Sequence, residues 1–317
     1  MQELFDIYEL EFIKNTDIIE EIEDGYSGAL IYKITRDENK FFLKIFKGTL
    51  GIEKVKQCIS IYRKLNIKSL DIVDFGYVDK FDKYYIVYNF IEGVNLKSYT
   101  KTDVFSLADV RKIGETIGKE LLKLKTYKDY NNDLFTPDNI DIIIDNAKKN
   151  FNLLLENQIY SNIIFKYFSI KEIDDLKNKL IEYGNIFKDI EPGLIHGDIK
   201  RSNIMVNENE EFYITDIESM QVSYDVLNFR YQITWSLFEG SEKEAEFVRG
   251  YFDGIYSNNR PENFNYSIIF TIILNFFTES YKRYRNLNIT GFETYVQKCK
   301  KLFDKINRIN LDTEFIV

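Results

Sequence analysis

Residues 1–91 consist mostly of short runs in which apolar and polar residues alternate, separated by turn-forming residues. A period of two along the chain is typical of β-strands with one buried face, and runs joined by short turns predict antiparallel hairpins. One stretch, 50–65, instead has helical spacing, and an amphipathic piece within 1–15 predicts a short leading helix. The predicted strands, which together form a small antiparallel sheet, cover 18–23, 29–35, 41–46, 72–78 and 84–90.

From residue 92 onward the pattern changes, because apolar residues recur mainly at intervals of three and four, as on one face of an amphipathic helix. Two short apolar runs, at 204–206 and 212–215, interrupt the helical pattern around the polar turn 207–210 and predict two strands. We therefore expect the C-terminal part to be mainly helical. Its predicted helices cover 107–125, 140–155, 160–168, 170–187, 229–238, 242–256, 264–285 and 292–309.

Length and composition fit a folded protein with a large core. The chain has 317 residues, 44% of them hydrophobic and 29% charged, which is typical of globular proteins and suits one large domain or two lobes. No basic N-terminal segment precedes an apolar run, and the longest strongly apolar run, from Tyr266 to Phe277, is too short to span a bilayer. We therefore expect a cytoplasmic protein without a membrane partner.

The charge balance restricts the class of partner. A formal net charge of −9 argues against broad nucleic-acid binding, which depends on neutralising phosphates with Lys and Arg, and it favours cationic small substrates. Cys58 and Cys299 stand far apart in the sequence and indicate neither a disulfide framework nor a metal site. The sequence leaves the oligomeric state open.

A group of polar residues with chemical potential lies around the two short strands at 204–206 and 212–215. Asp198 stands in a loop, Asn203 follows it five residues later, and Asp216 comes directly after the second strand. Phosphoryl transfer needs an acid that orients or deprotonates the attacking hydroxyl, and oxygen ligands for the Mg²⁺ that bridges the nucleotide phosphates. A single loop Asp or Asn is more commonly a turn former or cap. The combination at this spacing favours Asp198 as the catalytic acid-base group and Asn203 and Asp216 as metal ligands.

The motif His196-Gly197-Asp198-x4-Asn203 with Ile214-x-Asp216-x-Glu218 resembles the aminoglycoside phosphotransferase and choline kinase family, a branch of the protein-kinase-like fold. The segment departs from the family pattern because Ile217, not an aromatic residue, stands between the two acids. The resemblance implies an α+β, two-lobed fold with an antiparallel β N-terminal lobe at 1–91, which binds nucleotide, and a mainly helical catalytic and substrate-binding lobe at 92–317. It also implies a kinase that uses Mg²⁺ to transfer the γ-phosphate of ATP or GTP to a hydroxyl of a small molecule.

The resemblance assigns phosphate-binding residues in the N-terminal lobe. Lys44 alternates with apolar neighbours on the third predicted strand, where this fold keeps the lysine that binds the nucleotide phosphates. The turn that contains Gly25, Ser27 and Gly28 would lie over the same phosphates, since glycine lets the backbone approach a ligand closely. Taken without the resemblance, that turn is more commonly an ordinary hairpin connection.

Two further segments of the N-terminal lobe match the family. Glu53 is the only glutamate in the predicted helix 50–65 and is the candidate to pair with Lys44, although the family's glutamate usually stands about where Gln57 is. The stretch 88–93 resembles the hinge, in which the backbone groups of Asn89 and Ile91 would hydrogen-bond the purine. The choice between adenine and guanine stays open.

Other residues around the motif receive supporting roles. Lys200, two residues after Asp198, is familiar from protein kinases and would offset charge on the transferred phosphoryl group. His196 is the only histidine in the chain and would shape the loop by bonding its backbone instead of acting as the base. Glu218 would be a second acid near the metal. Asp225 would either brace the catalytic loop or cap a helix N-terminus.

Two alternatives remain beside a small-molecule kinase. A protein kinase is favoured by Lys200, but neither Phe-Gly nor an Ala-Pro-Glu segment follows Asp216. A non-catalytic nucleotide-binding module, or pseudokinase, would have no chemical need for Lys44, Asp198, Asn203 and Asp216 together. Among small molecules, the sequence does not choose between aminoglycosides, amino alcohols, sugars and similar acceptors.

Overall fold

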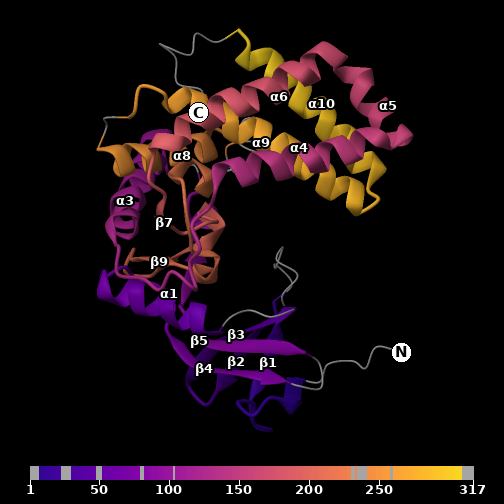
Figure 1. Cartoon of the computed structure of the whole chain (residues 1–317). Helices are drawn as coiled ribbons and strands as arrows, with labels where there is room; N and C mark the ends of the chain where they lie inside the picture. The colour runs from indigo at the N-terminus through magenta and orange to yellow at the C-terminus, as the bar shows by residue number, and fades with distance from the viewer. Residues whose placement is uncertain are drawn as a thin grey trace. The chain divides into compact units, whose positions relative to one another are not determined.

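The chain forms two compact units, which are described one at a time. The first comprises Met1–Tyr99, Asp133–Phe135 and Ser202–Ser219, and the second comprises Thr100–Asn132, Thr136–Arg201 and Met220–Val317. The first unit thus extends past residue 91 and takes in two later segments, whereas the predicted lobes met at residue 91. The computed structural model (Figure 1) describes residues 7–22, 30–47, 52–78, 82–102, 104–229, 233, 241–257 and 260–308.

The first unit is built on a five-stranded antiparallel sheet with the strand order β1-β2-β3-β5-β4. The central strands are buried over consecutive residues, 43–46 and 85–88, so both faces of the sheet are covered there instead of the single face that a period of two predicts. Leu43, Ile45 and Val87 belong to the core cluster on one of these faces. All five predicted strands are confirmed within a residue or two of their ends. Their bounds are β1 Ile18–Glu21, β2 Leu30–Arg36, β3 Asn39–Lys47, β4 Ile72–Val78 and β5 Lys83–Asn89.

Helical structure in the first unit is limited. Helix α1, Ile52–Lys64, confirms the predicted helix and buries a face that includes Val55, Ile59 and Tyr62. The predicted leading helix is reduced, within 7–15, to one 3-10 turn at Ile7–Glu9.

A second, three-stranded sheet of the first unit has the order β6-β8-β9. Strands β8, Ile204–Asn207, and β9, Phe212–Ile214, form the predicted hairpin. Strand β6, Gly93–Asn95, pairs antiparallel with β8 and leads into the short helix α2, Leu96–Tyr99. The sequence pattern did not predict β6, because three residues are too few to establish a period.

Two helices of the second unit cross at unusually close range. Helix α3, Leu107–Thr126, begins with a capping box between Ser106 and Asp109, and α8 covers Glu242–Tyr256. Glycines on both helices face the backbone of the other helix at the crossing, where an added Cβ would collide with carbonyl groups. These glycines are Gly114 and Gly118 on α3 and Gly250 and Gly254 on α8.

The other long helices of the second unit pack around α9, Phe264–Arg285 (Figure 1). Helix α9 is buried along most of its length, and stacked aromatic rings join it to its neighbours, with Phe151 and Phe277 4.2 Å apart between ring centroids. Within the described ranges, no helix is both long and apolar enough to cross a lipid bilayer. The remaining helices are α4 Ile140–Glu156, α5 Gln158–Tyr167, α6 Ile170–Gly184 and α10 Ile289–Ile306.

A few predicted boundaries differ from the structure. The predicted helix 170–187 ends as α6 at Gly184 and continues as a 3-10 helix, Asn185–Asp189. The predicted helix 292–309 begins at Ile289, where Asn288 caps the N-terminus. Most of the predicted helix 229–238 lies outside the described residues. The two-stranded pairing of β7, Gly193–Ile195, with β10, Gln221–Ser223, was not predicted.

Candidate active site

The hairpin of β8 and β9 in the first unit brings the two predicted metal ligands together. Ile204 pairs with Ile214, and the Thr215 backbone N–H donates to the Asn203 carbonyl oxygen at 2.9 Å. Asn203 and Asp216 therefore stand at the open end of the same hairpin. Asp216 has a φ of 55°, in the left-handed region that Asp and Asn adopt more readily than most residues. The chain thus leaves the strand at Asp216.

Lys44 is bound at the same place by two carboxylates. Its Nζ donates to Asp216 Oδ1 at 2.8 Å and to Glu218 Oε1. The lysine side chain is only 5% exposed, Glu218 is 9% exposed and Asp216 is 33% exposed. Burial alone would lower the pKa of Lys44, but the charges of Glu218 and then Asp216 outweigh it and raise that pKa. Lys44 is therefore protonated at neutral pH.

Helix α1 does not supply the predicted partner of Lys44. The Glu53 side chain is 73% exposed and its Oε1 accepts a hydrogen bond from Lys56 Nζ at 3.0 Å. Glu53 is therefore not the acid that binds Lys44, and Glu218 occupies that role. Gln57, one turn later on the helix, has a buried Oε1 without a hydrogen-bond partner among the described residues.

The predicted nucleotide contacts of the first unit are only partly described. The Asn89 backbone N–H donates to the Asp71 carbonyl oxygen at 3.0 Å, so this donor is already used within the unit. Ile91 lies in the link between β5 and β6, and its contact with a purine stays a prediction. Gly25, Ser27 and Gly28 lie outside the described residues.

In the second unit, the catalytic loop follows β7 and is shaped by hydrogen bonds to its backbone. The fully buried His196 accepts a hydrogen bond at Nδ1 from the Asp198 backbone N–H at 3.3 Å, which is the contact expected of it. Gly197 has a φ of 87°, a conformation that favours glycine, and its N–H donates to Asn228 Oδ1 at 2.7 Å. Asn228 in turn donates from Nδ2 to the Tyr251 hydroxyl at 3.0 Å.

Asp198 and Lys200 form an ion pair, with Lys200 Nζ 2.7 Å from Asp198 Oδ2. Both side chains are partly exposed, which the role predicted for Asp198 requires. Next to them, the buried Arg201 donates to Glu244 Oε2 at 2.8 Å and to Thr100 Oγ1 at 2.8 Å. Arg201 therefore anchors this part of the loop to the second unit.

The buried Asp225 contacts helices instead of the catalytic loop. It begins a 3-10 helix, Asp225–Phe229, and accepts hydrogen bonds from Lys125 Nζ on α3 and, at 3.4 Å, from the Tyr256 hydroxyl on α8. The bond to the loop backbone comes from Asn228, three residues later. Nothing in the sequence distinguished Asn228 from other loop asparagines, because its role depends on a contact with a residue 31 positions away.

The first unit's residues fit a divalent cation and a polyphosphate. Asn203 and Asp216 present amide and carboxylate oxygens, which are the ligands that Mg²⁺ prefers. Asp216 and Glu218 already bind the ammonium of Lys44, so their carboxylate oxygens are placed to bind a cation. Lys44 adds a donor of the kind that binds phosphate oxygens. The set can therefore hold Mg²⁺ and bind phosphate oxygens.

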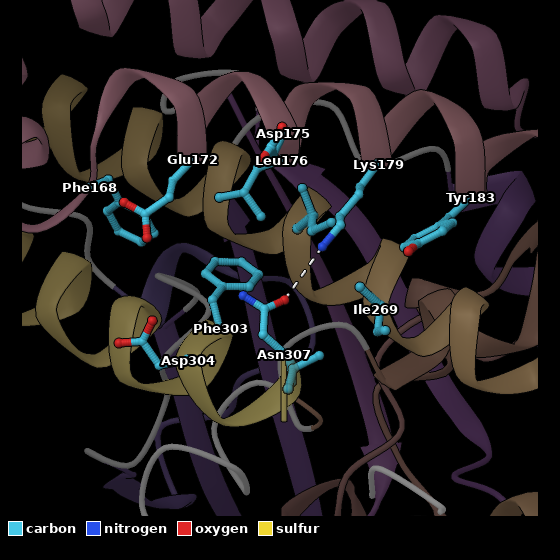
Figure 2. Close-up of a pocket in the computed structure, with 12 residues that line it drawn as sticks. Phe168, Glu172, Asp175, Leu176, Lys179, Tyr183, Ile269, Phe303, Asp304 and Asn307 are labelled. Carbon is cyan, nitrogen blue, oxygen red and sulfur yellow. Dashed lines mark hydrogen bonds between the residues drawn. The ribbon is translucent and has the colours of Figure 1, made fainter. Parts of the chain in front are cut away.

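A separate cavity in the second unit, between α6, α9 and α10, contains none of the predicted site residues (Figure 2). It encloses about 270 Å³, and two of its acids, Glu172 and Asp304, are both bound by Lys300. Lys179 closes one side through a hydrogen bond of 3.4 Å to Asn307 Oδ1. Because these polar groups already pair with one another, we assign the cavity no part in the reaction.

The fold and the motif agree with comparisons to known proteins. One similar structure is spectinomycin phosphotransferase APH(9)-Ia in complex with ADP and spectinomycin, with a TM-score of 0.63 and 14% identity over 90% of this chain and 89% of that chain. Another is ethanolamine kinase from Plasmodium vivax, with a TM-score of 0.63 and 15% identity over 95% of this chain and 88% of that chain. A third is an aminoglycoside phosphotransferase from Alicyclobacillus acidocaldarius, with a TM-score of 0.58 and 12% identity over 92% of this chain and 93% of that chain.

These likenesses confirm the two-lobed kinase-like fold, with an antiparallel β N-terminal lobe and a mainly helical C-terminal lobe. None of the curated protein sequences compared with this chain is significantly similar to it. The sequence profile of the phosphotransferase enzyme family matches residues 18–220, which include both the strand of Lys44 and the catalytic loop. The chain therefore belongs to the phosphotransferase enzyme family and is itself a phosphotransferase.

Proposed function

We propose that this enzyme uses Mg²⁺ to transfer the γ-phosphate of ATP or GTP to a hydroxyl group of a small molecule. The observation that carries the proposal is the ion pair of the buried Lys44 with the partly exposed Asp216, at the hairpin end that also bears Asn203. A phosphate-binding cation and metal-binding oxygens are the parts that phosphoryl transfer requires. We also propose that 1–91 and 92–317 act as the nucleotide-binding lobe and the catalytic and acceptor-binding lobe.

The donor side of the reaction depends on the first unit. Lys44 would donate from Nζ to oxygens of the α- and β-phosphates, and Asn203 and Asp216 would hold the metal. Bound Mg²⁺ would neutralise charge on the β- and γ-phosphates. Lys44 can exchange its bond with Asp216 for bonds to phosphate, since both acceptors are anionic oxygens.

The acceptor side depends on Asp198. Its carboxylate would accept the proton of the acceptor hydroxyl while the hydroxyl oxygen forms a bond to the γ-phosphorus. The bond between the γ-phosphorus and the bridging oxygen breaks, and the electron pair leaves with the nucleoside diphosphate. Lys200, 2.7 Å from Asp198, would balance charge on the transferred phosphoryl group.

A small-molecule acceptor is supported by the similar structures, because a spectinomycin phosphotransferase and an ethanolamine kinase are both named for small acceptors. The net charge of −9 supports a cationic acceptor and an enzyme that does not bind nucleic acid.

The test is nucleotide turnover with Mg²⁺, using ATP and GTP in parallel with pools of amino alcohols, aminoglycosides and sugars. We expect one pool to stimulate release of the nucleoside diphosphate, and the Asp198→Asn variant to lose that stimulation while it still binds nucleotide. The proposal fails if no pool stimulates turnover of either nucleotide, or if Asp198→Asn retains the full stimulated rate.

A further inference from the structure

We propose that Glu218 is the permanent counter-ion of Lys44, and that it frees Asp216 to bind the metal. Glu218 is then a positioning residue: it keeps the ammonium in place while the carboxylate of Asp216 exchanges the lysine for Mg²⁺. The inference rests on the proposed function, because it assigns Lys44 and Asp216 to phosphates and metal.

The exposure of the two acids separates their roles. Glu218 is 9% exposed and Asp216 is 33% exposed, although both carboxylates accept hydrogen bonds from the same Lys44 Nζ. The more exposed carboxylate can be reached by a ligand from solvent, whereas the more buried one is confined to the lysine. The two contacts with Lys44 are therefore not equivalent.

A single acid could not serve both cations well. Lys44 is 5% exposed, and an ammonium at that depth needs a carboxylate beside it to offset the loss of hydration. If Asp216 were its only partner, metal binding would have to compete with the lysine for one carboxylate. Glu218 removes that competition because the lysine keeps an anionic partner after Asp216 turns to the metal.

Helix α1 packs on the 3-10 turn Ile217–Ser219, which carries Glu218, and the helix presents no acid there. Its one glutamate, Glu53, is 73% exposed and bound to Lys56. Gln57 carries a neutral amide, and its buried Oε1 has no hydrogen-bond partner among the described residues. Within the described part of this unit, the acids that bind Lys44 therefore come from the segment after the β8–β9 hairpin, which carries Asp216 and Glu218, and not from helix α1.

This arrangement makes a charge-exchange experiment possible. Glu218→Gln removes the permanent counter-ion at nearly constant shape. Combining it with Gln57→Glu places a carboxylate on α1, the helix that packs on the turn of Glu218, at a side chain whose Oε1 is buried. Glu20→Gln is the matched control, since it removes a glutamate that pairs with Lys33 at 3.0 Å in the same unit and is 58% exposed.

The measurement is binding of a fluorescent ADP as a function of Mg²⁺ concentration, with thermal unfolding of each variant followed in parallel. We expect Glu218→Gln to raise the Mg²⁺ concentration for half-maximal binding about tenfold, as loss of a hydrogen bond between charged groups implies. The double variant should recover most of that change, and Glu20→Gln should stay within about twofold of the unmodified enzyme. A purely structural role of Glu218 would lower the unfolding temperature without changing the Mg²⁺ dependence.

Two outcomes overturn the inference in distinguishable ways. If the unmodified enzyme binds Mg²⁺-ADP but Glu218→Gln shows the same Mg²⁺ midpoint, the inference is wrong and the proposed function stands. If the unmodified enzyme binds no nucleotide, the proposed function and the inference fall together. Should Glu218→Gln not fold, Glu218→Asp draws the carboxylate away from Lys44 Nζ by one methylene, so its Mg²⁺ midpoint should still rise several-fold, and an unchanged midpoint in that variant refutes the inference as well.

Discussion

The crossing of α3 and α8 makes a quantitative stability prediction for Gly250→Ala. A Cβ added to Gly250 would lie 2.8 Å from the Arg111 carbonyl carbon and 2.9 Å from the Glu115 amide nitrogen, and closer still to the Arg111 carbonyl oxygen. All three are backbone atoms of α3, which cannot rotate away as a side chain can. Since favourable contact begins at about 3.5 Å, the carbonyl carbon alone requires the helices to separate by about 0.7 Å, and the closer carbonyl oxygen requires more.

Two opposing effects set the size of the change. Overpacking of a close interface costs about 3 kcal/mol at the upper end of its usual range, and the rigid backbone here places Gly250 at that end. Replacing glycine by alanine in a helix recovers about 1 kcal/mol through helix propensity. We therefore expect Gly250→Ala to lower the free energy of unfolding by about 2 kcal/mol. The site should respond too, because the neighbouring Tyr251 holds Asn228 through its hydroxyl.

The assay is urea unfolding at 25 °C followed by circular dichroism, with Gly184→Ala as the control. A Cβ on Gly184 would meet first the Cδ1 atom of Ile144, the end of a flexible side chain that can move. The control should therefore change the free energy of unfolding by less than about 1 kcal/mol. The reasoning is refuted if Gly250→Ala is as stable as the unmodified protein, or if the control is the more damaged of the two.

Three further predictions concern the loop, a helix cap and a thiol. Asn228→Ala removes the acceptor of the Gly197 N–H and should lower kcat about tenfold or more, while the nucleotide affinity stays within about twofold. Steady-state kinetics that show an equal loss of kcat and of nucleotide affinity would contradict this prediction. The backbone N–H of Ser169, together with the Lys300 ammonium and the Ser169 hydroxyl, lowers the pKa of Glu172 from 4.5 to about 2, so the stabilisation is present above pH 4.5 and is lost as pH falls towards 2. Glu172→Gln should accordingly be less stable than the unmodified protein at pH 7 but not at pH 2 in urea unfolding, and a constant difference would refute this. Burial raises the pKa of the Cys58 thiol to about 12, so a thiol reagent should modify it at pH 8 only after unfolding, and rapid modification of the folded protein would be the contrary result.

Much of the fold follows from local patterns. The five strands of the first sheet were predicted because each is long enough to show a repeating pattern. Lys44 could be singled out within β3 because its immediate neighbours in the strand are apolar. Long helices such as α3 carry a periodic apolar face over many turns, so their bounds were predicted closely. Strand β6 was missed because three residues show no period and its pairing with β8 is made far along the chain.

The site residues likewise include some that a local pattern predicts and others that depend on contacts far along the chain. Asn203 and Asp216 could be found from the sequence because a hairpin of fixed length places them together. The contact between Lys44 and Glu218 spans 174 positions, and no local pattern encodes it. Glu53 was the wrong partner for Lys44 because the sequence of α1 does not tell which way its polar residues face. Only the packing of α1 shows that the Glu53 side chain is exposed and that the Oε1 atom of Gln57 is buried.

The central claim, Mg²⁺-dependent phosphate transfer to a small hydroxyl compound, is tested most directly by following labelled γ-phosphate. Labelled ATP and GTP would be incubated with each acceptor pool, and the products separated to identify the molecule that carries the label. The account predicts label in a small-molecule product, dependence on Mg²⁺, and a loss of at least about a hundredfold in the Asp198→Asn variant. Label found only in inorganic phosphate or in protein, or transfer that is undiminished in Asp198→Asn, would contradict it.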